Sequence, residues 1–94
     1  MRGRILVVDD EQNIRTVLRT LLSRLGYEVS EAVDGRDALE FVKHTEVDLV
    51  LTDLRMPKLS GLELLDELKQ THPEVPVIVL TAHGALDSAV DAMK

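Results

Sequence analysis

The chain has 94 residues, of which 11 are basic and 17 acidic, so its net charge at neutral pH is −6. This length is typical of one small domain, and a hydrophobic content of 45% is sufficient for a buried core. The acidic balance argues against direct binding of nucleic acid, because a phosphate backbone requires a basic surface. The absence of cysteine excludes disulfides, thiolate metal sites and cysteine nucleophiles. The apolar run at residues 5–8 is too short for a signal peptide or a membrane span, so we expect a cytoplasmic protein without a membrane partner.

The first part of the chain predicts a strand, a helix and a second strand. Residues 5–8 are all apolar, which is typical of a strand buried on both faces. Apolar residues in the range 11–25 recur at the spacing of one helix face, and Gly26 follows as a terminating glycine. We expect that apolar stripe to lie in the core. Residues 27–33 alternate between apolar and polar side chains, which indicates a half-exposed edge strand.

The rest of the chain continues this alternation of helices and strands. The expected elements are a helix over residues 36–44, a strand over 47–53, a helix over 60–71, a strand over 77–80 and a weakly apolar helix from about residue 85. Ser60 and Glu63 have the spacing of a capping box at the start of the third helix. The leucine stripe of that helix is also expected in the core.

Strands that alternate with helices form a parallel sheet with right-handed crossovers, so the sequence predicts an α/β, doubly wound fold. Because the second strand has the pattern of an edge, we expect the strand order 2-1-3-4. The fourth strand is uniformly apolar and has none of the charges that protect an exposed edge. We therefore expect its outer side to be covered by a fifth strand that this chain lacks or by another chain.

Three carboxylates and one hydroxyl lie at the carboxyl ends of the buried strands. Asp9 and Asp10 follow the first strand, Asp53 ends the third, and Thr81 follows the fourth. These side chains should converge, because parallel strands end at one edge of the sheet. Carboxylates about 4 Å apart repel by roughly 4 kcal/mol per pair at an effective dielectric of about 20, and a hard cation such as Mg²⁺ removes that cost. A carboxylate beside Mg²⁺ can attack phosphorus to give an aspartyl-phosphate, with Thr81 placed to donate to a phosphoryl oxygen.

Three motifs resemble the receiver domain of two-component response regulators. They are VVDDE at residues 7–11, LTDLRMP at residues 51–57 together with Gly61, and LTA at residues 80–82. The resemblance covers the whole chain in the right order and implies the flavodoxin-like fold of that family. It also implies that the protein is not an enzyme in the ordinary sense. It would be a phosphoacceptor that takes part in its own phosphotransfer and dephosphorylation.

The resemblance assigns roles to individual residues. It implies that Asp53 accepts a phosphoryl group from a histidine kinase and that Thr81 is the switch hydroxyl. The implied ligands of Mg²⁺ are Asp9, Asp10, Asp53 and the backbone carbonyl of Arg55. Arg55 and His83 occupy positions that border the phosphoryl group in this family and tune its lifetime.

The last residues refine the resemblance and also limit it. Residues 81–94 look most like the receivers of sigma-54-dependent (NtrC-like) transcription activators, which implies an output domain or downstream partner that responds to the fourth-helix region. Receivers also carry a lysine at the end of a fifth strand, an aromatic switch residue within that strand, and a fifth helix. All three would lie beyond Lys94. We therefore expect residues 1–94 to be a receiver domain truncated at its carboxyl end.

The sequence leaves alternatives to this function. The main alternative is a truncated receiver that acts without phosphorylation as an interaction module, or forms a homodimer through its bare fourth strand. A metal-dependent phosphohydrolase typically has a second acid two positions after the nucleophile, where this chain has Arg55. Dinucleotide binding requires a glycine-rich motif after the first strand, and the sequence has none.

Several polar residues also have simpler structural interpretations. Asp10, taken alone, is as well explained by capping of the first helix as by metal binding. Asp34 and Gly35 are interpreted as a turn without a ligand role. His44 and His72 are interpreted as solvated residues at helix ends.

Overall fold

The computed structural model describes residues 3–54, 56 and 58–80. Within these residues, strands and helices alternate along the chain. The elements in chain order are β1 (Arg4–Val8), α1 (Gln12–Arg24), β2 (Glu28–Ala32), α2 (Gly35–His44), β3 (Leu49–Asp53), α3 (Gly61–Thr71) and β4 (Val77–Leu80). The helix predicted from about residue 85 lies outside the described residues.

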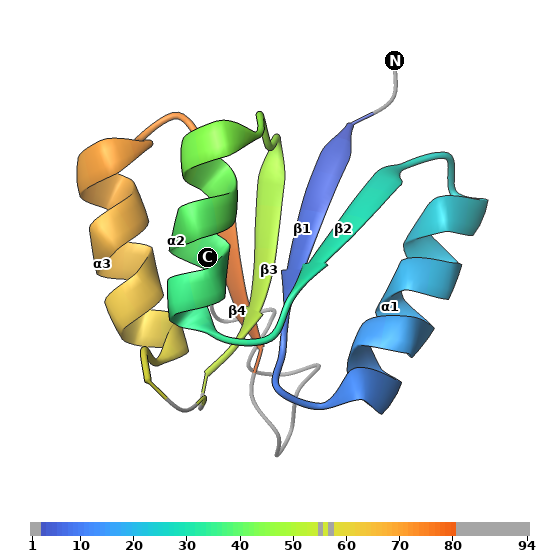
Figure 1. The fold of residues 1–94 in the computed structure, drawn as a ribbon. Coiled ribbons are helices and arrows are strands. Elements are labelled where there is room, and N and C mark those ends of the chain that lie inside the picture. Colours follow the sequence, from blue (N-terminus) through green and yellow to red (C-terminus); the bar gives the residue numbers. More distant parts are fainter. Residues whose placement is uncertain (1–2, 55, 57, 81–94) are drawn as a thin grey trace.

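The four strands form one parallel sheet in the order β2-β1-β3-β4 (Figure 1). This arrangement confirms the predicted α/β fold and its strand order. Strand β2 lies at the edge of the sheet, as predicted, and its residues run from exposed Glu28 to buried Ala32 without a strict alternation in burial. Strand β4 is half-buried along its whole length, and within the described part of the chain it pairs only with β3. The prediction that a fifth strand or another chain covers β4 stays a prediction.

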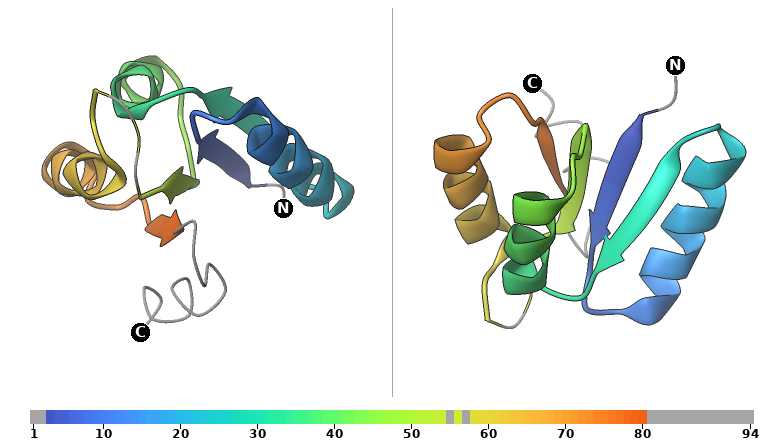
Figure 2. Two further views of the ribbon diagram at one scale, coloured as in Figure 1. Left: turned by 90° about the horizontal axis from the view of Figure 1, so that it is seen from below. Right: turned by 45° about the horizontal axis from the view of Figure 1, so that its top comes forward.

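The main core lies between the sheet and the helices α2 and α3, which cover the same face (Figures 1 and 2). Its buried side chains come from all of these elements and are Leu6, Val8, Ala32, Ala38, Val42, Val47, Val50, Leu64 and Leu68. Leu64 and Leu68 are fully buried, which confirms the predicted core role of the α3 stripe. Full burial of such a side chain contributes about 1.5–3 kcal/mol. The core thus anchors α3, and with it the segment that leaves β3.

Helix α1 lies on the opposite face of the sheet, and its predicted place in the core is wrong (Figure 2). No residue of α1 is buried, and Ile14, Val17 and Leu21 are 40%, 57% and 52% exposed. The helix packs mainly against β1 and β2. No other described helix lies on that face to close over the stripe. Helical periodicity therefore identified the apolar face of α1 but not what covers it.

The connection from β3 to α3 brings two backbone segments into direct contact at Gly61. The amide of Gly61 donates to the carbonyl oxygen of Leu54 at 2.9 Å. Ser60 and Glu63 form the predicted capping box, in which each side chain accepts from the other residue's amide, at 3.2 and 3.0 Å. A Cβ atom at Gly61 would collide with the carbonyl oxygen of Asp53. The missing side chain therefore lets the start of α3 rest against the end of β3.

Replacing Gly61 with alanine tests this contact. Alanine in place of helical glycine normally adds up to about 1 kcal/mol of stability, whereas the collision is expected to cost about 1–3 kcal/mol. We therefore expect Gly61→Ala to lower the free energy of unfolding measured by urea titration. Gly3→Ala is the control, because its Cβ would meet the Tyr27 ring at 3.4 Å, an ordinary contact. Equal stability of the two variants would contradict the close approach.

Candidate functional site

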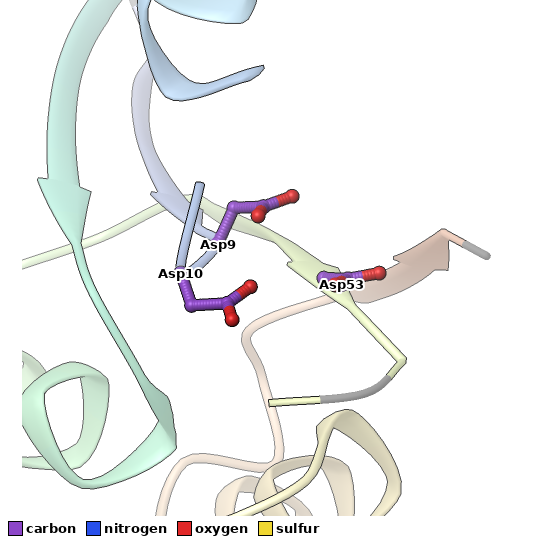
Figure 3. A group of neighbouring side chains, drawn as sticks. All are labelled: Asp9, Asp10 and Asp53. Carbon is purple, nitrogen blue, oxygen red and sulfur yellow. The ribbon is translucent and has the colours of Figure 1, made fainter. Parts of the chain in front are cut away.

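The register of the sheet brings acidic residues from two strands to one edge. Val8, the last residue of β1, pairs with Thr52 of β3. Asp9 and Asp10 follow β1, and Asp53 is the last residue of β3. The three acidic side chains extend in the same direction from these strand ends (Figure 3). One carboxylate oxygen from each lies within 4.8 Å of the others, so acids more than 40 positions apart in the sequence form one cluster.

Asp9 is the most buried member of the cluster. It is only 6% exposed, and its amide donates to the carbonyl oxygen of Ala32 on β2 at 3.1 Å. Its Oδ1 accepts from the amide of Glu11 at 2.8 Å. Glu11 is the N-cap of α1 and makes no side-chain capping bond, so the interpretation of Asp10 as the helix cap is not supported. Asp10 is the exposed member of the cluster.

The position of Asp9 changes its ionisation. Burial raises the pKa of the Asp9 carboxyl above its ordinary value of 3.8, and the charges of Asp53, Asp10 and Glu11 raise this pKa further. The hydrogen bond from the amide of Glu11 lowers the pKa, because it stabilises the charged form. Because the net result is a raised pKa, the ionised form of Asp9 is less stable in the folded state than in the unfolded state. Ionisation of Asp9 at neutral pH therefore lowers the stability of the fold. A cation next to Asp9 would reverse that effect.

Asp53 is half-buried and is held by the backbone around it. Its Oδ1 accepts from the amide of Leu54 at 2.9 Å, and the same amide donates to the carbonyl oxygen of Leu80 on β4 at 2.8 Å. The hydroxyl of Thr52 donates to the carbonyl oxygen of Asp53 at 3.0 Å. The sheet and its immediate continuation therefore set the orientation of this carboxylate.

Three of the predicted site residues, Arg55, Thr81 and His83, lie outside the described residues. The residue before Thr81 in the sequence, Leu80, is described, and it pairs with Asp53 across β4 and β3. The ligand role of the Arg55 carbonyl, the switch role of Thr81 and the tuning roles of Arg55 and His83 stay predictions.

Asp34 and His44, which the sequence assigns to structural roles, lie outside the acidic cluster. Asp34 caps α2 by accepting from the amide of Asp37 at 2.8 Å, as its interpretation as a turn residue implied. Its other carboxylate oxygen lies 3.8 Å from Nζ of Lys58 in the connection between β3 and α3. His44 is exposed and contacts Glu40 at 3.0 Å. These contacts hold helix ends and loops without involving the acidic cluster.

Sequence reasoning missed Arg15, which contacts the cluster from outside, and Glu31, which pairs with Arg15. Arg15 donates through Nη1 to the carbonyl oxygen of Asp9 at 2.7 Å and through Nε to Glu31 at 3.1 Å. The sequence signal for this contact is weak. A basic residue near the start of an amphipathic helix and an acidic residue on an edge strand are both ordinarily assigned to solvent.

The donor set of the cluster fits a hard divalent cation. Asp9, Asp10 and Asp53 offer carboxylate oxygens, which are the ligands that Mg²⁺ prefers in proteins. Mg²⁺ commonly binds one or two carboxylates and keeps several waters, so a partly open site suits it. The burial of Asp9 further favours cation binding, because water solvates the charge on that residue poorly and a cation would compensate it.

Comparisons with known proteins agree with this arrangement. Residues 5–94 match the family described as the response regulator receiver domain. The chain is 41% identical over 88 residues to the luminescence regulatory protein LuxO of Vibrio campbellii and 46% identical over 90 residues to the transcriptional regulatory protein ZraR of Klebsiella oxytoca. These alignments cover 94% and 96% of this chain but 19% and 20% of the relatives. The chain therefore spans about a fifth of the length of these relatives.

The fold of this chain is also similar to that of solved response regulators. The response regulator TrrA of Thermotoga maritima, solved in complex with Mg²⁺ and BeF, superposes with a TM-score of 0.84 at 40% identity. That match covers 99% of this chain and 80% of TrrA.

LuxO and ZraR are named as regulatory proteins, which agrees with the predicted resemblance to receivers of transcription activators. None of the helices in the described ranges has the length and apolar character needed to cross a membrane. The family match, the flavodoxin-like sheet and the similarity to TrrA show that this chain belongs to the receiver domain family of response regulators.

Proposed function

We propose that this chain accepts a phosphoryl group on Asp53 in a reaction that requires Mg²⁺ held by Asp9, Asp10 and Asp53. The observation that carries the proposal is the approach of these three carboxylates to within 4.8 Å. Like charges repel, so the arrangement costs stability unless a cation is bound. TrrA, a relative with the same fold, was solved with Mg²⁺, and the proposal assigns the same cation to this chain.

The proposed donor is the phosphohistidine of a histidine kinase. A carboxylate oxygen of Asp53 attacks phosphorus and forms an O–P bond, while the N–P bond breaks and its electron pair stays on the histidine nitrogen. The hydrogen bonds at Thr52 and Leu54 fix the backbone that carries the attacking carboxylate, which reduces the entropy lost on reaching the reactive geometry. When bound, Mg²⁺ would offset the negative charge of the transferring group.

The resemblance to receivers supplies the remaining proposed roles. The Arg55 carbonyl completes the protein ligands of Mg²⁺, and the Thr81 hydroxyl donates to a phosphoryl oxygen and so acts as the switch. Arg55 and His83 tune how long the phosphoryl group persists. The signal then passes through the fourth-helix region to an output domain or a downstream partner.

The wider setting follows from the same proposal. Because the relatives are about five times longer than this chain, we infer that residues 1–94 correspond to the receiver portion of a regulator. We propose control of transcription, by analogy with sigma-54-dependent activators, in the cytoplasm. The chain would act as a phosphoacceptor switch and not as an enzyme that turns over an external substrate.

A second candidate function is supported by the exposed apolar surface. Val17 and Leu21 of α1 are each more than half exposed, and β4 has one described strand neighbour. Such surfaces suit an interaction or dimerisation module that works without phosphorylation. Sedimentation of the chain at high concentration tests this candidate. A monomer would contradict it, and a dimer that forms equally well with Asp53→Asn would support it.

The phosphoryl group should be accepted by Asp53 and by no other carboxylate. We expect Asp53→Asn to abolish labelling by acetyl phosphate in the presence of Mg²⁺, because an amide lacks the nucleophilic oxygen of a carboxylate. The increase in intact mass on mass spectrometry measures the labelling. Asp66→Asn is the matched control, with the same change of charge at an exposed position of α3. Labelling of the two variants to the same extent would rule out Asp53 as the acceptor.

Asp9→Asn should have opposite effects without and with Mg²⁺. Without the metal, we expect it to raise the free energy of unfolding at neutral pH, because it removes a charge whose pKa is raised by burial. With the metal, we expect Mg²⁺ affinity to fall by at least about tenfold, so that Mg²⁺ stabilises the variant less than the wild type.

The pH dependence of the Asp9→Asn effect checks its cause. The folded-state pKa of Asp9 lies above the unfolded value near 3.8, so the wild type without Mg²⁺ should lose stability as pH rises from about 4 through the folded-state pKa. The advantage of the variant should therefore grow over that window and level off above it. An advantage that is the same at pH 3 and pH 7 would contradict the assignment to ionised Asp9.

A further inference from the structure

Arg15 links the acidic cluster to the edge of the sheet. It is the fourth residue of α1, and its side chain is only 12% exposed. Its Nε contacts Glu31 of β2 at 3.1 Å, and its Nη1 donates to the carbonyl oxygen of Asp9 at 2.7 Å. One planar guanidinium group therefore joins α1, β2 and the residue that follows β1.

Because this guanidinium is largely buried, both of its contacts are needed to offset the cost of removing its charge from water. A charged group removed from water is costly unless it is paired and its hydrogen bonds are satisfied. Glu31 supplies the opposite charge, and its side chain is 27% exposed. Once Glu31 fixes the Nε side of the planar fork, the Nη1 arm has a defined direction toward Asp9.

The backbone of Asp9 is consequently held on both sides of its α-carbon. Its amide donates to Ala32 of β2, and its carbonyl accepts from Arg15. Its carboxylate also accepts from Glu11, the N-cap of α1. These three contacts oppose a movement that the charges in the cluster favour, namely rotation of the Asp9 carboxylate away from Asp53 and Asp10.

We propose that Arg15 is a positioning residue, which holds Asp9 in its metal-binding orientation through the Asp9 carbonyl. The proposal rests on the Mg²⁺ site of the proposed function. Arg15 touches no carboxylate of the cluster among the described contacts, and its partner in the cluster is a backbone oxygen. Its effect on Mg²⁺ is therefore one of geometry, with Glu31 as the support that aims the guanidinium.

Geometry and charge predict opposite effects of removing this residue. The positive charge of Arg15 repels a cation, so its loss should raise Mg²⁺ affinity if only charge matters. Loss of the contact to Asp9 should lower Mg²⁺ affinity, since the site must then be ordered on binding. The sign of the change decides between the two effects.

Arg19 provides a matched control on the same helix. It pairs with the other carboxylate oxygen of Glu31 at 3.2 Å, but its side chain is 62% exposed and it makes no described contact with Asp9. Arg15→Gln and Arg19→Gln therefore remove the same charge and a contact to the same partner. Only Arg15→Gln removes the contact to Asp9.

The experiment measures Mg²⁺ dissociation constants of the whole chain by isothermal titration calorimetry. We expect Arg15→Gln to weaken binding by about tenfold and Arg19→Gln to leave it unchanged or slightly tighter. Arg15→Lys keeps the charge, but a single ammonium group cannot span both partners of the guanidinium. We expect Arg15→Lys to weaken binding as well, by a smaller factor. Circular dichroism without Mg²⁺ verifies that each variant is folded.

The possible outcomes separate this proposal from the proposed function. Equal affinities of Arg15→Gln and Arg19→Gln, or tighter binding by Arg15→Gln, would overturn the positioning role and leave the metal site intact. Wild-type affinity in Arg15→Lys would show that the guanidinium contacts to both Glu31 and Asp9 are not needed for Mg²⁺ binding, which would also overturn the positioning role. Absence of Mg²⁺ binding by the wild type would overturn the metal site and the positioning role together. If Arg15→Gln does not fold, Arg15→Lys decides.

Discussion

Repulsion among three carboxylates is the constraint on which the rest of this structure depends. At an effective dielectric of about 20, two such charges roughly 4 Å apart oppose each other by about 4 kcal/mol, a large fraction of the stability of a small domain. The fold nevertheless holds Asp9, Asp10 and Asp53 together. Stability is therefore lower than it would be with neutral side chains, as is common at functional sites. A cation bound between the three carboxylates would replace their repulsion by attraction to the cation and so raise the stability of the fold.

The parallel sheet makes this convergence unavoidable. Adjacent strands β1 and β3 end at the same level, so residues that follow one strand meet those at the end of the other. The surrounding backbone then limits how the acids can separate. Gly61 lets α3 rest against the end of β3, and Arg15 connects the Asp9 carbonyl to β2 through Glu31. The acidic edge is thus held by contacts from α1, α3 and β2, none of which supplies a carboxylate to the cluster.

The sequence predicted the features that follow from local pattern. A wholly apolar run marked the central strand β1, alternation marked β2 as an edge, and Ser60 with Glu63 marked the start of α3. It failed where the outcome depended on distant packing. The stripe of α1 was expected in the core, but periodicity cannot show whether another layer covers a face. The contact between Arg15 and Asp9 was missed for the same reason. Arg15 and Glu31 have the pattern of exposed polar residues, and they pair only when α1 packs against β2. The roles of Thr81 and His83 rest on resemblance and stay predictions.

The most direct test of the shared cation site is a crystal structure of the chain grown with Mn²⁺, which has an anomalous signal and prefers the same oxygen ligands as Mg²⁺. An anomalous peak within coordination distance of Asp9, Asp10 and Asp53 is the expected result. The account would be contradicted by the absence of a peak at the cluster when Mn²⁺ is in excess, or by a peak bound by other residues alone.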